Sequence, residues 1–149
     1  MGVCSWTSTV VMDLPPFKWG VTYTQNKGWD ICFVCGAPIV QDWPTTWEAI
    51  QLHLNNFKLL TLLIGEFNQI EHHLDKLGGS EYIRGWDEFI KWNIEMGLID
   101  LLFTKSQFTW CSKQFHEDLI FERLDRAYCT TDWKNMFDDS YVFNFPIIV

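Results

Sequence analysis

The stretch Leu62-Leu-Ile-Gly-Glu-Phe-Asn-Gln-Ile70 joins an apolar run to a polar segment. The run covers residues 59–64 and is almost wholly apolar, which predicts a strand buried on both faces, as in a sheet covered by helices. The strand stops at the glycine of this stretch, and residues 66–80 form a polar loop that follows it. In α/β proteins the loops after buried strands build functional sites, so this polar loop is the first place to look for one.

Two strands and a helix are expected upstream of this stretch. Residues 19–25 alternate loosely and residues 31–34 are continuously apolar, which predicts two strands, the second of them buried. Thr45 and Glu48 have the spacing of a capping box, which predicts that a helix begins there. The apolar residues of this helix recur at helical spacing and are Trp47, Ile50, Leu54 and Phe57.

A second helix is expected downstream over residues 81–96, with Gly97 as its stop. Its inward-facing residues are expected to be Ile83, Trp86, Phe89, Ile90 and Ile94. Short strands are expected at residues 98–103, 107–111, 119–121, 124–129 and 141–149, with a brief helix at 132–137. Strands that alternate with helices, followed by several strands in succession, predict a layered α/β fold with mixed sheets.

The composition is that of a folded protein with one domain. The chain has 149 residues, of which 48% are hydrophobic and 17% aromatic, and this excludes a disordered tail. We expect a poorly defined N-terminal segment at residues 1–27 and the folded domain at residues 28–149. No apolar run approaches the ~20 residues that span a membrane, and the N-terminus lacks the pattern of a secretory signal. A soluble intracellular protein is therefore expected.

Cysteine spacing and net charge limit the classes of site. Cys32 and Cys35 are three apart in a strand and so point to opposite faces, which predicts reduced, partly buried thiols rather than a shared metal site. The net charge of −8 argues against a protein that binds nucleic acid by general electrostatics. It leaves room for a metal-dependent nuclease, whose site is locally acidic.

Several motifs, in order along the chain, resemble those of the endonuclease/exonuclease/phosphatase superfamily. Residues 62–70 are similar to its strand that runs into Gly-Asp-Phe-Asn, and residues 33–38 to its strand that ends in Tyr-Gly-x-Pro. Phe108-Thr-Trp110 followed by Glu122-Arg-Leu-Asp-Arg126 resembles the branch carried by LINE-type (non-LTR) retrotransposons. The resemblance covers roughly residues 28–137.

The resemblance implies a partial four-layer α/β sandwich of the DNase I type, with mixed sheets flanked by helices. It implies a domain that uses a divalent metal, usually Mg²⁺, to cleave phosphodiesters and that nicks DNA as its partner. The family's Asp, which positions the attacking water, corresponds to Glu66 here, and its phosphate-binding Asn corresponds to Asn68. The family's Tyr, which donates a hydrogen bond to phosphate, corresponds to Cys35.

The chain departs from the family pattern at these positions and at both ends. Glu66 adds a methylene, and a misplacement of about 1 Å in such a site can cost about 100-fold in rate. Cys35 donates far more weakly than tyrosine. The family's metal-binding Glu has no match in residues 1–27, so a metal ligand is not expected there, and its closing Ser-Asp-His motif is not found before Val149.

The expected function is therefore a degenerate fragment of such an endonuclease domain with weak or no activity. Two alternatives stay open: an active Mg²⁺-dependent nuclease or phosphoesterase, and a non-enzymatic interaction module that reuses the fold. Arg123 and Asp125 are expected to pair with each other or to support the site from the next strand. His72-His73 with its acidic neighbours is expected to be a solvated loop rather than a metal site, and Trp110 and Trp133 are expected to be packing residues.

Overall fold

The computed structural model describes residues 20–26, 29–57, 60–112 and 119–147. The expected N-terminal segment lies mostly outside these residues, but its last part forms a strand, as the alternation predicted. The main sheet has five strands in the order β1-β2-β3-β9-β5. They are β1 (Gly20–Asn26), β2 (Trp29–Cys35), β3 (Leu60–Glu66), β9 (Asp125–Cys129) and β5 (Ile99–Asp100).

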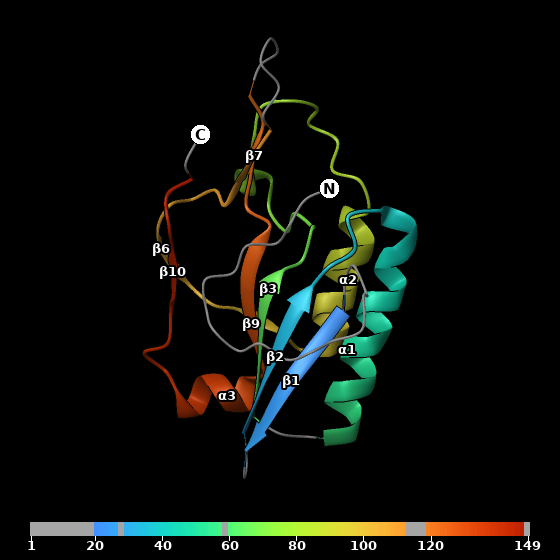
Figure 1. Cartoon of the computed structure of the whole chain (residues 1–149), viewed down its shortest axis with the longest axis vertical. Coiled ribbons are helices and arrows are strands. Elements are labelled where there is room, and N and C mark those ends of the chain that lie inside the picture. Colours follow the sequence, from blue (N-terminus) through green and yellow to red (C-terminus); the bar gives the residue numbers. More distant parts are fainter. Residues whose placement is uncertain (1–19, 27–28, 58–59, 113–118, 148–149) are drawn as a thin grey trace.

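The sheet is mixed in strand direction. β2 and β3 are parallel, and the helix α1 (Trp43–Phe57) connects them as the crossover that parallel neighbours require. The pairs β1–β2, β3–β9 and β9–β5 are antiparallel. Figure 1 shows α1 and α2 (Trp86–Met96) along one flank of this sheet.

The helix-facing side of the sheet carries the larger core cluster. Alternate strand residues such as Leu63 and Tyr128 point to this side and are fully buried. They pack against Ile50 of α1 and against Phe89 and Trp92 of α2. Both helices therefore bury one apolar face against the sheet.

The opposite side carries a second cluster. Leu101, Ala127, Cys129 and Trp133 are buried there, and half-buried residues that include Leu62 pack on them. One face of β3 is buried and the other is half-buried under the second cluster, so the predicted burial on both faces is confirmed in part. Trp133 is 8% exposed and serves in packing, as expected.

The bounds of the helices differ from the expectation. α1 begins at Trp43, two residues before the expected cap, so Thr45 lies inside the first turn and the capping-box prediction is wrong. Pro44 occupies the first turn instead, where its missing N–H has no intrahelical acceptor to lose. A short 3-10 turn, Val40–Asp42, leads into the helix.

α2 begins later than expected, because Gly85 adopts a left-handed conformation with φ 66° directly before it. A Cβ at Gly85 would lie 2.3 Å from the ring of Trp43, so this position requires glycine. Gly97 ends α2 with φ 62°, as predicted. Ile94 is 73% exposed, so its expected inward position is wrong, and Trp92 faces the core instead.

Smaller elements surround the main sheet. β4 (Lys76–Leu77), β8 (Phe121–Glu122) and β7 (Trp110–Cys111) form a three-stranded sheet, and β6 (Phe103–Lys105) pairs in parallel with β10 (Val142–Asn144). The expected loop 66–80 thus contains a 3-10 turn, His73–Asp75, and the strand β4. α3 (Thr131–Met136) is the expected brief helix, capped by the Thr130 side chain.

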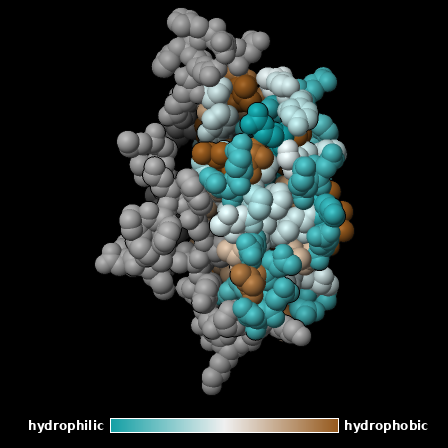
Figure 2. Space-filling model, turned by 90° about the vertical axis from the view of Figure 1, so that its right-hand side faces the viewer, coloured by the Kyte–Doolittle hydropathy of each residue, from teal (hydrophilic) through white to brown (hydrophobic). Residues whose placement is uncertain are grey.

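The fold is α/β with mixed sheets flanked by helices, as the sequence predicted. Figure 2 shows the side of the molecule that carries α1 and α2, where hydrophilic and intermediate residues make up most of the coloured surface. Hydrophobic residues gather there only in a few separate areas. In the part of the chain that the structure describes, no helix is long and apolar enough to cross a membrane.

Candidate active site

The candidate residues at the ends of β2 and β3 lie next to each other. Cys35 and Glu66 are partners in the parallel register, and Glu66 is in turn the partner of Asp125 on β9. Residues in register on adjacent strands share a face, with Cβ atoms about 4.5–5.5 Å apart. The three side chains therefore form a row across three strands, at one end of the sheet and on the side away from α1 and α2.

Asp125 is held by a threonine on a separate segment. The Thr109 hydroxyl oxygen accepts hydrogen bonds from the backbone N–H groups of Leu124 and Asp125, both at 3.0 Å. Burial raises the pKa of the Asp125 carboxyl; a hydrogen bond from Thr109 lowers it, and the nearby charge of Glu66 raises it further. The pKa of Asp125 consequently lies above its ordinary value, as expected for a half-buried carboxyl beside another carboxylate.

Asn68 fixes the loop that follows β3. Its backbone is left-handed, with φ 55°, and its side-chain amide donates a hydrogen bond to the Gly36 carbonyl at 2.6 Å. The Gly36 N–H donates to the Glu66 carbonyl, also at 2.6 Å. A Cβ at Gly36 would lie 2.4 Å from the Phe67 carbonyl oxygen, so glycine is required for this close approach. The ends of β2 and β3 are thereby locked together beside the row.

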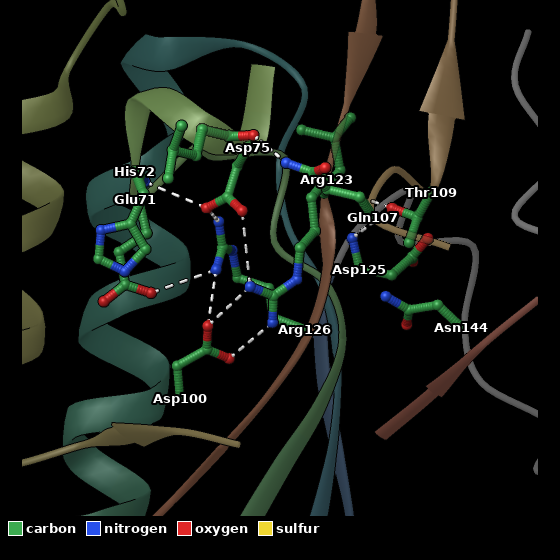
Figure 3. A network of polar contacts seen from close by, with 12 residues as sticks. Glu71, His72, Asp75, Asp100, Gln107, Thr109, Arg123, Asp125, Arg126 and Asn144 are labelled. Carbon is green, nitrogen blue, oxygen red and sulfur yellow. Dashed lines mark hydrogen bonds and ion pairs between the residues drawn. The ribbon is translucent and has the colours of Figure 1, made fainter. Parts of the chain in front are cut away.

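A network of buried charged side chains lies on the helix-facing side of β9, opposite to the side that carries the row of Cys35, Glu66 and Asp125 (Figure 3). The Arg126 side chain is completely buried. Its Nη1 atom lies 2.8 Å from Asp100 and 3.3 Å from Glu71, and its Nη2 atom lies 2.5 Å from Asp75. Burial alone would lower the pKa of Arg126, but the neighbouring Tyr128, Asp100 and Asp75 together raise it, so the guanidinium stays charged.

Arg123 belongs to the same network. Its two terminal nitrogens lie 3.0 Å from the two oxygens of Asp100, and its guanidinium lies over the ring of Phe103 at 4.1 Å. The Tyr128 hydroxyl donates to Glu71 at 2.7 Å. These bonds tie the loop after β3 to β9 and β5, and thus hold the strand ends that carry the row.

The expectations for the neighbouring residues are partly corrected. Arg123 pairs with Asp100 and Asp75, not with Asp125, and it lies between β8 and β9 rather than on a strand. His72 and His73 are exposed, as expected for a solvated loop, but the neighbouring Asp75 is 4% exposed and accepts a hydrogen bond from the His72 N–H at 3.1 Å. Trp110 is 41% exposed and is therefore not a core residue.

Two residues of this site were missed by reasoning from the sequence. Asp125 was expected only as a support, and Thr109 was given no role. The strand register places Asp125 opposite Glu66, and Thr109 bonds to the backbone of Asp125. Asp125 and Thr109 therefore lie at the same end of the sheet as Glu66. The signal was their position at the start of a strand that follows a loop, but the pairing of β9 with β3 cannot be read from the chain order.

Comparison with known proteins is informative at the level of structure. No family model matches the chain, and no curated protein matches it. A solved structure described as the endonuclease domain of TRAS1, a telomere-specific non-LTR retrotransposon, matches with a TM-score of 0.55 at 19% sequence identity. The match covers 79% of this chain and 51% of that one, so the chain spans about half the length of the TRAS1 domain.

A second similar structure is an endonuclease/exonuclease/phosphatase family protein from Leptotrichia buccalis, with a TM-score of 0.44 and 21% identity. That match covers 73% of this chain and 40% of the other. The likeness to the TRAS1 domain agrees with the observed mixed sheet and its flanking helices. The chain therefore has an α/β fold of the DNase I-like type, as its motifs predicted.

Proposed function

We propose that the chain is a degenerate part of an endonuclease domain of the non-LTR retrotransposon type, with weak or no phosphodiester-cleaving activity. The fold it shares with the TRAS1 endonuclease domain supports this lineage. The order of its motifs supports it independently, since those motifs fall on the strand ends that form the candidate site. DNA is the substrate that such a domain would act on.

One observation carries the proposal: the row of Cys35, Glu66 and Asp125, with Asn68 locked beside it. Two carboxylates and an amide at one end of the sheet can orient a water molecule and contact a phosphate oxygen. This is the arrangement that phosphodiester hydrolysis needs. The buried charge network around Arg126, on the other side of the sheet, holds these strand ends in place.

The same residues explain why activity should be weak. Glu66 carries its carboxylate farther from the backbone than the family's Asp, and in-line attack tolerates little displacement. Cys35 replaces a strong phenolic donor with a thiol. One amide N–H of Asn68 is bonded to Gly36, and so that donor is occupied by the protein itself. The net charge of −8 also disfavours approach of DNA.

The two carboxylates fit a hard divalent ion such as Mg²⁺. Glu66 and Asp125 are partners in the strand register, so two acidic groups lie side by side, and a cation would relieve their repulsion. Glu66 and Asp125 would hold the ion through their carboxylate oxygen atoms. When bound, Mg²⁺ would polarise the phosphate and favour deprotonation of water.

The test is nicking of supercoiled plasmid by purified protein in Mg²⁺ and in Mn²⁺, with Asn68→Ala in parallel. We expect wild type to nick no faster than Asn68→Ala, because the site lacks the family's donors. Metal-dependent nicking that is lost in Asn68→Ala would show a working nuclease and overturn the proposal.

An interaction module is the second candidate, and exposed apolar residues near β10 favour it. Phe143 and Phe145 are 47% and 77% exposed, and Tyr141 is 63% exposed. Apolar groups that gather in this way mark association surfaces. A stable complex that persists in Asn68→Ala but is lost in Phe143→Ser would favour this function, while a monomer in both variants would count against it.

A further inference from the structure

A buried polar cluster lies between β2 and α1, away from the candidate active site. Asp30 and Cys32 are two residues apart on β2, so their side chains point to the same face. His53 of α1 meets them from the helix. Asp30 and Cys32 are completely buried, and His53 is 7% exposed. This face is opposite to the one that carries Cys35, Glu66 and their row.

The three side chains converge on one carboxylate oxygen. His53 Nε2 contacts Asp30 Oδ2, and Cys32 Sγ lies 3.5 Å from the same oxygen. One ligand atom from each residue can be chosen so that all lie within 4.8 Å of one another. The ligand atoms around one zinc ion are roughly 3–4 Å apart, given bond lengths of about 2.0–2.3 Å. Small side-chain rotations therefore suffice to place an ion among them.

The carboxylate of Asp30 is incompletely satisfied by the protein. Its second oxygen, Oδ1, is buried and has no hydrogen-bond partner among the described residues. A buried carboxylate oxygen without a partner is costly, because it has lost its water and gained nothing in exchange. A cation held by both oxygens would remove that cost.

We propose that Asp30, Cys32 and His53 form a binding site for a borderline-soft divalent transition-metal ion such as Zn²⁺. A thiolate, an imidazole and a carboxylate are the ligands that zinc takes in proteins, whereas Mg²⁺ prefers oxygen alone. Sγ, Nε2 and the two oxygens of Asp30 supply four donor atoms. On binding, the Cys32 thiol loses its proton to solvent and the sulfur becomes a thiolate ligand.

The consequence of this site is structural. An ion there would join the first half of β2 to the second half of α1, and so hold the crossover helix against the sheet. An ion that binds the folded chain and not the unfolded chain raises the free energy of unfolding. The site is distinct from the row of Cys35, Glu66 and Asp125, which lies on the other face of the sheet.

Cobalt provides the sharpest probe. Metal-free, untagged protein is titrated with Co²⁺ while the near-ultraviolet thiolate-to-cobalt absorption is recorded. We expect one equivalent of Co²⁺ to produce this band and Zn²⁺ to bleach it. Cys32→Ser should lose the band, whereas Cys129→Ser, which changes a buried cysteine on the opposite face, should keep it. His53→Ala should bind Zn²⁺ about tenfold more weakly or worse.

Two further measurements keep the proposal open to refutation if Cys32→Ser does not fold. The X-ray absorption spectrum of zinc-loaded wild type should show one sulfur at about 2.3 Å. Zn²⁺, but not Mg²⁺, should raise the melting temperature of wild type. The absence of saturable Co²⁺ and Zn²⁺ binding would overturn the proposal and leave Asp30 and His53 as a plain ion pair. A band that survives in Cys32→Ser would overturn it as well.

Discussion

At the scale of single residues, the candidate site depends on which side chains the register brings together. The resemblance of residues 62–70 made Glu66 and Asn68 candidates, and they lie at the end of β3 and in the loop after it. It did not identify Asp125, because nothing in a single sequence states that β9 pairs with β3. The cluster around His53 was missed for a similar reason. Cys32 was compared with Cys35, whereas its neighbour on the same face is Asp30.

We expect Asp125→Asn to raise the melting temperature of the metal-free protein at neutral pH. Burial and the charge of Glu66 raise the pKa of Asp125 in the folded chain, although its hydrogen bond to Thr109 opposes them. Between the unfolded and the folded pKa, the folded chain binds more protons than the unfolded chain. Wild-type stability therefore falls as pH rises through this window, and the cost of the ionised carboxylate is fully present above it.

The measurement is thermal unfolding of both proteins in EDTA between about pH 4 and pH 7.5. The gain from asparagine should shrink as pH falls through the folded pKa of Asp125. The matched control is Asp139→Asn, which changes an exposed carboxylate. A lower melting temperature of Asp125→Asn at neutral pH would contradict this interpretation of the site.

At the scale of elements, periodicity identified the long strands and both main helices, but local backbone chemistry set their ends. The apolar run in β3 predicted a strand buried on both faces, and the structure buries one face and half-buries the other. The start of α2 was misplaced because the left-handed Gly85 packs against Trp43, a contact between segments far apart in sequence. Ile94 fits the helical period, but Trp92 faces the core of the protein and Ile94 lies on the exposed side of the helix.

The contact between β2 and β3 makes Gly65 irreplaceable. Its φ is 152°, and a Cβ there would lie 1.9 Å from the Val34 carbonyl oxygen. We expect Gly65→Ala to abolish cooperative folding, since backbone on both strands would have to move. Gly97→Ala is the matched control, because its Cβ meets nothing within 4 Å. It should cost only about 1–2 kcal/mol for its left-handed backbone. Equal losses in urea unfolding would contradict the close approach of the two strands.

The charge network should be a major contributor to the stability of the site. Arg126→Met leaves three acidic groups, Asp75, Asp100 and Glu71, without this cation, and breaking such a buried network costs about 3–5 kcal/mol. Lys91→Gln removes the exposed pair with Glu95 and should change stability by at most about 1 kcal/mol. Chemical denaturation compares the two variants. Similar small losses in both would show that Arg126 contributes little.

At the scale of the whole molecule, the fold and the net charge point in different directions. The chain shares its fold with an endonuclease domain, of which it spans about half the length. Yet its net charge of −8 disfavours binding to DNA by general electrostatics. A protein can keep its fold after it has lost catalytic activity. The core depends on many apolar contacts, whereas catalysis depends on a few atoms placed within about 1 Å.

The most direct test separates the chemistry from DNA binding. Hydrolysis of bis(p-nitrophenyl) phosphate, a small phosphodiester, is followed at high protein concentration in Mn²⁺ for wild type, Asn68→Ala and Glu66→Asp. Because this substrate does not depend on the charge of the protein surface, a negative result cannot be attributed to poor DNA binding. We expect the three proteins to hydrolyse it at the same background rate. A wild-type rate that falls at least about tenfold in Asn68→Ala and rises in Glu66→Asp would contradict the loss of activity and show a working catalytic site.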